Sequence, residues 1–126
     1  MFEVGVVGHF EASHHLVGDF GPASHVHAHA YRIEANVSGS RLQPDGTLFD
    51  ITVLQSAVGQ LTRSLDGRDL NELPELVRQN PTAEVLARYA FETLAAAVRS
   101  SGLDRLQVRV WESAEAFAAY ASDLGS

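Results

Sequence analysis

The chain has 126 residues, 45% of them hydrophobic and 20% charged, a composition that fits a globular domain rather than a disordered segment. Its net charge of -7 argues against a nucleic-acid surface, because phosphate backbones are bound mainly by clustered cations. Cysteine and lysine are both absent, which excludes disulfides, thiol catalysis and Schiff-base chemistry. We therefore expect one domain over residues 1–126 and no nucleic-acid partner.

No stretch approaches the roughly 20 consecutive apolar residues that a membrane-spanning helix needs. The N-terminus also lacks the basic region and apolar run of a secretory signal. These features predict a cytoplasmic location and no membrane partner.

Two strands are predicted in the first part of the chain. Over residues 2–13 apolar side chains recur at every second position, as in a half-buried strand. A loop containing glycine and proline follows, and a second strand is predicted over residues 25–37. Because alternate residues of a strand share a face, His25, His27 and His29 would all point the same way.

Two helices are predicted in the middle of the chain. Asp50 is a typical N-cap, and apolar residues then recur at helical spacing through Leu65. For the second helix, Asn80 is the expected cap, Pro81 the first helical residue and Gly102 the end.

A third strand is predicted over residues 106–112, with Glu112 on the same face as its aliphatic side chains. The tail over residues 114–124 is compatible with either a helix or a fourth strand. This order of elements predicts the α+β class, with a four-stranded antiparallel sheet and two helices on one side.

The alternating histidines suggest a metal site. Two imidazoles at positions i and i+2 of a strand can bind one ion, and catalytic zinc commonly takes three protein ligands and a water. His27 and His29 would form such a pair, with His14 or His15 of the neighbouring strand as the third ligand. The alternative is a set of solvated or core-edge histidines without a metal.

Glu112 is a second candidate, because a buried carboxylate needs a cation or several hydrogen-bond donors. One interpretation is a salt bridge to an arginine. The other is recognition of a ligand's amino-pyrimidine edge through two parallel N–H bonds. Thr82 and Glu84 also fit ordinary positions in the first turn of a helix, and Asp66 fits the start of a turn.

Five segments, in the same order, resemble those of the 6-pyruvoyl-tetrahydropterin and 6-carboxy-tetrahydropterin synthase family. They are FEASHHL, HAHAY, PDGTLFDITVL, LDGRDLNELPELVRQNPTAEVLARY and VRVWES. By this resemblance, the zinc ligands correspond to His14, His27 and His29. The pterin-binding side chains correspond to Glu112, Thr82 and Glu84.

The resemblance implies a T-fold, or tunnelling fold, in which subunit sheets pair into barrels and six chains assemble as a dimer of trimers. The family's substrate is 7,8-dihydroneopterin triphosphate, bound between subunits, and its lyase reaction releases triphosphate. Zinc acts there as a Lewis acid on the substrate's side chain.

Two catalytic positions of the family are changed in this chain. Its proton-transferring cysteine corresponds to Ala23, and the histidine of its Asp-His relay corresponds to Gly67, so that only Asp66 of the relay remains. A general acid or base typically contributes ~10² to 10⁴ in rate, so the loss of both should cripple the reaction. Histidine is a common general acid or base, and His25 could serve as a replacement in this role.

Three functions follow as alternatives. The first is a protein that binds a pterin-like ligand between subunits and has lost the lyase reaction. The second is an active zinc-dependent lyase on dihydroneopterin triphosphate or a related pterin, with His25 as its acid or base. The third is an oligomeric subunit with only a structural or regulatory role.

Overall fold

The computed structural model describes residues 1–99 and 101–125, which form one mixed sheet in the strand order β3-β1-β2-β4-β5. Four longer strands run antiparallel to their neighbours: β1 (Phe2–His14), β2 (His27–Gly39), β4 (Arg105–Trp111) and β5 (Phe117–Asp123). The two-residue β3 (Arg68–Asp69) pairs in parallel with the end of β1.

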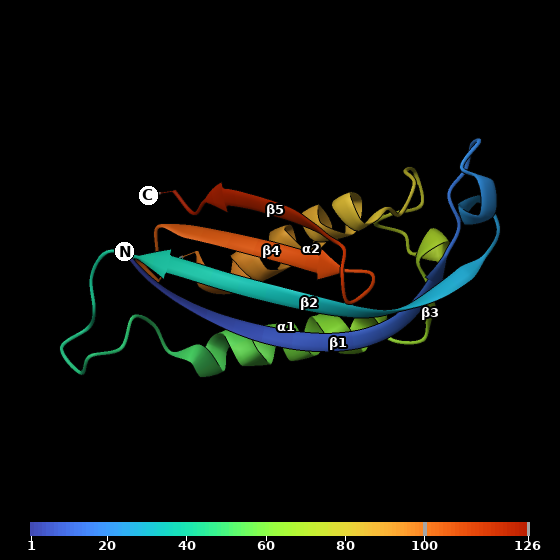
Figure 1. Ribbon diagram of the computed structural model, residues 1–126. Helices are drawn as coiled ribbons and strands as arrows, with labels where there is room; N and C mark the ends of the chain where they lie inside the picture. Colours follow the sequence, from blue (N-terminus) through green and yellow to red (C-terminus); the bar gives the residue numbers. More distant parts are fainter. Residues whose placement is uncertain (100, 126) are drawn as a thin grey trace.

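Two helices, α1 (Ile51–Leu65) and α2 (Ala83–Val98), cover one face of this sheet (Figure 1). The period-two pattern of β2 explains the layering, because its alternate residues Tyr31, Ile33 and Ala35 are buried toward the helices. Neither helix has both the length and the apolar character needed to cross a lipid bilayer. The predicted α+β arrangement, with both helices on one side, is confirmed.

The ends of α2 differ from the prediction. Thr82, not Asn80, is the N-cap, and its hydroxyl oxygen accepts a hydrogen bond from a backbone N–H in the first turn. The Asn80 side chain instead bonds to both backbone groups of Val17. Because that amide is occupied by a distant segment, the helix begins two residues later than expected. It ends at Val98, and Gly102, with a φ of +80°, lies in the turn that follows.

The sheet differs from the prediction at its two margins. The ambiguous tail is a strand, β5, and the short β3 makes the sheet five-stranded within the described residues. β3 follows Gly67, whose φ of +74° turns the chain after α1 and whose N–H donates to the Glu11 carbonyl at 2.7 Å. Strand β2 starts at His27 rather than His25, because a short 3-10 turn over Gly21–Ser24 takes up the preceding loop.

The sheet face turned away from the helices carries a stack of cationic and aromatic side chains. The Arg32 guanidinium lies 4.6 Å from the centre of the Trp111 ring, and that of Arg109 lies 4.9 Å from the Phe117 ring. The two rings are 4.6 Å apart, so the stack runs across β2, β4 and β5. No other element of the described chain covers this face.

Candidate metal and ligand site

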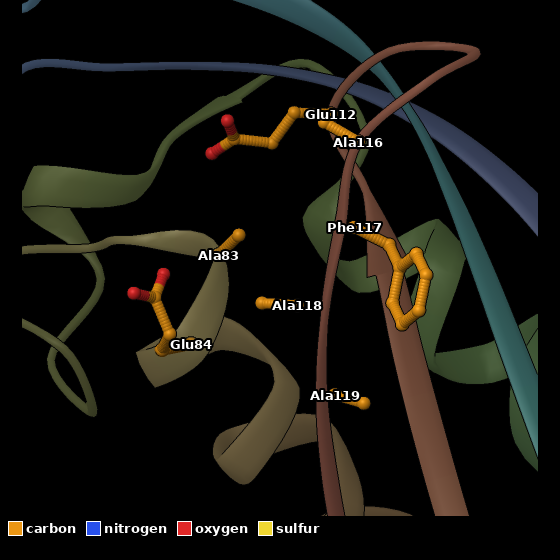
Figure 2. Close-up of a pocket in the computed structure, with 7 residues that line it drawn as sticks. All are labelled: Ala83, Glu84, Glu112, Ala116, Phe117, Ala118 and Ala119. Atoms are coloured by element: carbon orange, nitrogen blue, oxygen red, sulfur yellow. The ribbon is translucent and has the colours of Figure 1, made fainter.

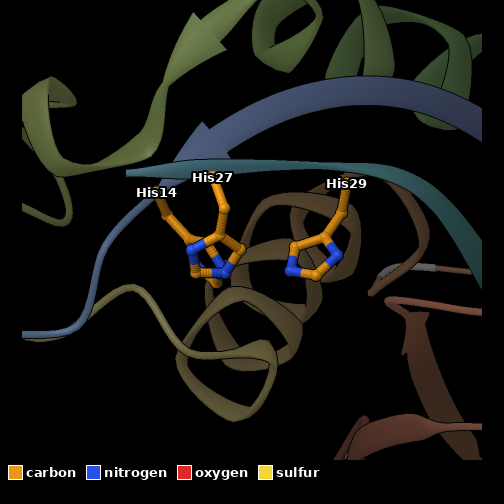
Figure 3. Close-up of side chains that lie close together, drawn as sticks. All are labelled: His14, His27 and His29. Atoms are coloured by element: carbon orange, nitrogen blue, oxygen red, sulfur yellow. The ribbon is translucent and has the colours of Figure 1, made fainter. Parts of the chain in front are cut away.

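Three histidines meet at one end of the sheet, on the face that the helices cover (Figure 3). His14 and His27 lie directly opposite each other in the β1–β2 ladder, and His29 follows two residues along β2. One ring nitrogen from each lies within 4.8 Å of those of the other two. The fold thus brings together the imidazoles that the sequence pattern singles out, in a cluster that could hold a metal ion.

Hydrogen bonds to backbone carbonyls orient two of the three rings. Nδ1 of His14 lies 2.7 Å from the Pro81 carbonyl oxygen, and Nδ1 of His27 lies 2.8 Å from that of His25. Since a carbonyl can only accept, each Nδ1 must carry the proton, which leaves the Nε2 lone pair free. Metal-binding histidines are usually held in this way, with the second nitrogen donating to a carbonyl or carboxylate. The donor set therefore fits a metal ion such as zinc.

The third ring, His29, has no hydrogen bond to the described residues, and its surroundings favour the neutral form. Burial lowers the pKa of His29, and the neighbouring His14 and His27 lower it further, while Glu112 acts in the opposite direction. A neutral imidazole is the form that binds metals. The lowered pKa of His29 and the free Nε2 atoms of His14 and His27 therefore both favour binding of a metal ion.

The segment that follows His14 is held by two asparagine side chains. Asn71 accepts from the His15 N–H at 2.9 Å and donates to its carbonyl at 3.0 Å. Asn80 makes the same pair of bonds with Val17, at 2.7 and 3.1 Å. Together with the Pro81 carbonyl, these contacts hold the end of β1 against the loop before α2. Sequence reasoning missed both contacts, because each joins segments more than fifty residues apart.

Glu112 lies one residue beyond β4 and is half-buried rather than enclosed in the core. Its backbone N–H donates to the Ala116 carbonyl at 3.2 Å and closes the turn toward β5. Its carboxylate has no arginine partner, since the only ion pair among the described residues joins Arg32 to Glu34. The salt-bridge interpretation is therefore wrong for the described residues, and the carboxylate is available to another donor.

A hollow of about 390 Å³ lies beside Glu112, between the start of α2 and strand β5. Figure 2 shows the carboxylates of Glu112 and Glu84 on the same side of this hollow. The remaining lining is mostly small: Ala83, Ala116, Phe117, Ala118 and Ala119. The carboxylates together with apolar walls suit a flat ligand that carries N–H donors on one edge.

Glu112 lies near His29 and Tyr31, although the histidines are not part of the lining of the hollow. Burial raises the pKa of Tyr31, and the charge of Glu112 raises it further; the same charge opposes the effect of burial on the pKa of His29. Tyr31 lies two residues beyond His29 on the same face of β2. Its part in the site could have been found from the period-two pattern, which places it in line with the histidines.

Thr82 and Glu84 lie at the start of α2. The Thr82 hydroxyl accepts from the Val85 N–H at 3.1 Å as the helix cap, which leaves its own hydrogen free to donate. Glu84 is exposed in the first helical turn, where a negative charge is favourable. Thr82 thus acts as the helix cap and Glu84 as an acidic residue of the first turn, as expected. Neither role prevents contact with a ligand in the hollow.

The two side chains expected to move protons are placed less favourably than the triad. Oδ1 of Asp66 accepts the Glu11 N–H at 2.9 Å, so this carboxylate ties the end of α1 to β1. His25 is exposed, and it contacts the triad through its carbonyl rather than its imidazole. The altered positions, Ala23 and Gly67, lie in the loops beside these two residues.

The sheet is mostly antiparallel and has helices on one face, with a histidine triad and a carboxylate-lined hollow among its features. These features define an α+β protein with a candidate metal site. A model of the family described as 6-pyruvoyl tetrahydropterin synthase matches residues 3–123. The chain therefore belongs to this family. No curated protein sequence matches it significantly.

Solved structures of the family have the same fold. The Caenorhabditis elegans 6-pyruvoyl tetrahydropterin synthase superposes with a TM-score of 0.81 at 23% identity, over 96% of this chain and 95% of that one. The Plasmodium falciparum enzyme gives 0.80 at 17% identity, over 97% and 98%. A Plasmodium vivax enzyme with a substituted catalytic glutamate gives 0.80 at 16% identity, over the same shares. The predicted T-fold is thereby confirmed.

Proposed function

We propose that this chain binds a pterin-like ligand at a site that includes Glu112, Thr82, Glu84 and the histidine triad, and that it has lost the usual lyase reaction on dihydroneopterin triphosphate. The observation that carries this proposal is the position of Glu112, whose carboxylate has no arginine partner among the described residues, beside a hollow and near His29 of the triad. A charged acceptor of this kind can take two parallel N–H bonds from an amino-pyrimidine edge.

The proposed metal ion is zinc, held by His14, His27 and His29. Three neutral nitrogen ligands and an open fourth position are the usual donor set of catalytic zinc. When bound, zinc would supply Lewis-acid polarisation of a ligand oxygen. The chain's own residues would hold the ligand: Glu112 orients the ring, and the free hydrogen of the Thr82 hydroxyl can donate to a ring acceptor.

The loss of the lyase reaction is inferred from the proton-transferring positions. Ala23 and Gly67 carry no ionisable group, and Asp66 is engaged by the Glu11 backbone. Without a positioned acid and base, the reaction loses factors of ~10² to 10⁴ for each group. Binding and metal coordination depend on other residues and can therefore persist.

An active lyase with His25 as the acid or base is the second candidate. His25 is close in sequence to the triad, and the Plasmodium vivax relative has a glutamate as a catalytic residue. This relative favours the alternative because it has a catalytic residue other than a cysteine. The exposed imidazole of His25 would have to turn toward the ligand to take this role.

The proposed assembly is a hexamer made of two trimers, with the ligand between subunits. The hollow lies along β5, whose outer edge is unpaired within the described chain. A free strand edge and an uncovered sheet face are surfaces that a neighbouring subunit can bury. The native mass, measured by mass spectrometry, should equal six chains; a stable monomer at micromolar concentration would contradict the intersubunit site.

The decisive test incubates the zinc-loaded protein with 7,8-dihydroneopterin triphosphate and measures both binding and product. We expect saturable binding with no 6-pyruvoyl- or 6-carboxy-tetrahydropterin formed. Turnover that His25→Ala abolishes would establish the second candidate instead. The absence of both binding and turnover would favour a purely structural or regulatory subunit. Glu112→Gln, which keeps the size of the side chain and removes its charge, should weaken this binding.

A further inference from the structure

His29 differs from the other two histidines of the triad in how its ring is held. Nδ1 of His14 and Nδ1 of His27 each donate to a backbone carbonyl oxygen, whereas the His29 ring has no hydrogen-bond partner among residues 1–99 and 101–125. His29 is also only half-buried, so the core does not enclose its ring. A ligand side chain that can change rotamer binds a metal ion more weakly, because that freedom is lost on binding. Another contact is therefore needed to hold this imidazole beside its two partners.

Tyr31 supplies such a contact. It lies two residues beyond His29 on the same face of β2, and the two ring centroids are 5.4 Å apart with 67° between the planes. The Tyr31 ring also lies 6.2 Å from the ring of His14, at an angle of 84°. These are edge-to-face arrangements, which aromatic rings favour at such distances. Tyr31 thus packs against two rings of the triad, including the one without a hydrogen bond.

The ring of Tyr31 is itself held in a defined orientation. Phe10 lies directly opposite on β1 and stacks against it, with 5.0 Å between the ring centroids and 15° between the planes. Both side chains belong to the core under the helices, and only 1% of Tyr31 is exposed. A ring packed in this way keeps one rotamer, and it restricts a neighbouring ring that packs against it. The ring contacts from Phe10 through Tyr31 therefore end at His29.

We propose that Tyr31 is a positioning residue of the metal site, whose ring, supported by Phe10, holds the imidazole of His29 in the rotamer that converges with the rest of the triad. This inference rests on the proposed zinc site. The role belongs to the ring, since the hydroxyl oxygen is buried and has no partner in the described part of the chain. Metal ligands are commonly oriented by a second layer of contacts. At His29, aromatic packing takes the place that carbonyl oxygens have at the other two rings.

The zinc affinity of full-length Tyr31 variants, measured by competition with a chelator, tests this role. Tyr31→Leu removes the aromatic ring, and we expect zinc affinity to fall about tenfold, as is usual when a contact that orients a metal ligand is lost. Tyr31→Phe keeps the ring and should bind zinc within about twofold of the wild type. The absorption spectrum of bound cobalt(II) should change in Tyr31→Leu and stay the same in Tyr31→Phe, because it reports the geometry of the ligands.

Val37→Ala is the matched control, because Val37 is fully buried on the same strand but pairs with Val4, away from the triad. This variant should lower the melting temperature and leave zinc affinity unchanged. If Tyr31 had only a structural role, Tyr31→Leu would behave in the same way. Wild-type zinc affinity in Tyr31→Leu, or an equal loss of affinity in Tyr31→Phe, would therefore overturn the inference and leave the proposed zinc site standing.

The zinc-free protein separates this inference from the proposed function. Three-bond couplings measured by NMR should show one χ1 rotamer of His29 in the wild type and in Tyr31→Phe, and averaged values in Tyr31→Leu. If the wild type shows one rotamer but does not bind zinc, the proposed metal ion is wrong, while the orientation of His29 by Tyr31 stands. Averaged couplings in the zinc-free wild type would overturn the inference.

Discussion

The histidine triad and the positions expected to transfer protons lie at the same end of the sheet, but their surroundings differ. The triad keeps an outer layer of contacts, in which two backbone carbonyls hold the proton-bearing nitrogens of His14 and His27. The other region has a methyl group at Ala23, no side chain at Gly67, and a carboxylate at Asp66 that bonds to the backbone. Metal binding and proton transfer depend on separate contacts, so one can be lost while the other is kept.

The largest expected effect is on metal binding. His27→Ala removes one of three ligands, and we expect zinc affinity to fall by at least about 100-fold, because the remaining pair cannot complete the site. Competition with a chelator of known affinity measures this change. His9→Ala, at an exposed histidine on the other face of β1, is the control and should leave affinity unchanged. Equal zinc affinity in His27→Ala and wild type would show that the triad is not a metal site, so that it could not be contrasted with the proton-transfer positions.

The next effect concerns the anchoring carboxylate. Glu112→Gln should weaken dihydroneopterin binding by about 10- to 100-fold, as expected when a charge-assisted hydrogen bond becomes a neutral one. Zinc content should stay the same, since Glu112 is not a member of the triad. Glu115→Gln, on the exposed turn nearby, is the control for a general change in charge. Unchanged binding in Glu112→Gln would mean that Glu112 has no part in ligand recognition.

A smaller effect tests whether the outer contacts position the triad. Asn71→Ala leaves the His15 N–H and carbonyl without their partners, and we expect a loss of about 1–3 kcal/mol in the free energy of unfolding. Zinc affinity should also fall, by roughly tenfold, because His14 is less firmly held. Asn36→Ala provides the control, since Asn36 lies in the same sheet away from the triad. Normal zinc affinity in a destabilised Asn71→Ala variant would show that the hydrogen bonds between Asn71 and His15 support the fold but not the metal site.

The smallest effect is expected at the remaining relay position. Asp66→Asn keeps an oxygen that can accept the Glu11 N–H, so stability should change by less than about 1 kcal/mol. Ligand and zinc affinities should equal those of the wild type, because neither site uses this carboxylate. A clear loss of ligand affinity in Asp66→Asn would show that the two regions are coupled after all. Chemical denaturation and titration calorimetry provide the two measurements.

Much of the fold could be predicted from local patterns. The apolar period of two in β1 and β2, and the helical spacing after Asp50, depend on side chains close in sequence, and these elements appear where they were predicted to within two residues. The start of α2 could not be predicted in this way. Asn80 and Thr82 are both good caps, and only the distant contact between Asn80 and Val17 determines which of them begins the helix.

The candidate site was predictable to a similar extent. Alternation along β2 placed His27, His29 and Tyr31 on one face, because side chains of a strand point to opposite sides in turn. The choice of His14 over His15 required the register of β1 with β2, which the resemblance supplied and the ladder of hydrogen bonds explains. The Pro81 carbonyl could not be predicted as a partner, since backbone groups carry no residue-specific signal.

By itself, the sequence determined the residue types and their periodicity: three histidines and a tyrosine that can share a strand face, a glutamate at the end of another strand, and no thiol anywhere in the chain. Only the tertiary structure decided which groups meet. It placed Pro81 and the Asn71 and Asn80 side chains against the end of β1, engaged Asp66 with the backbone, and left Glu112 and the Tyr31 hydroxyl without partners in the described chain. The physical reason is that hydrogen-bond pairing between distant segments depends on packing in three dimensions, which local periodicity does not specify.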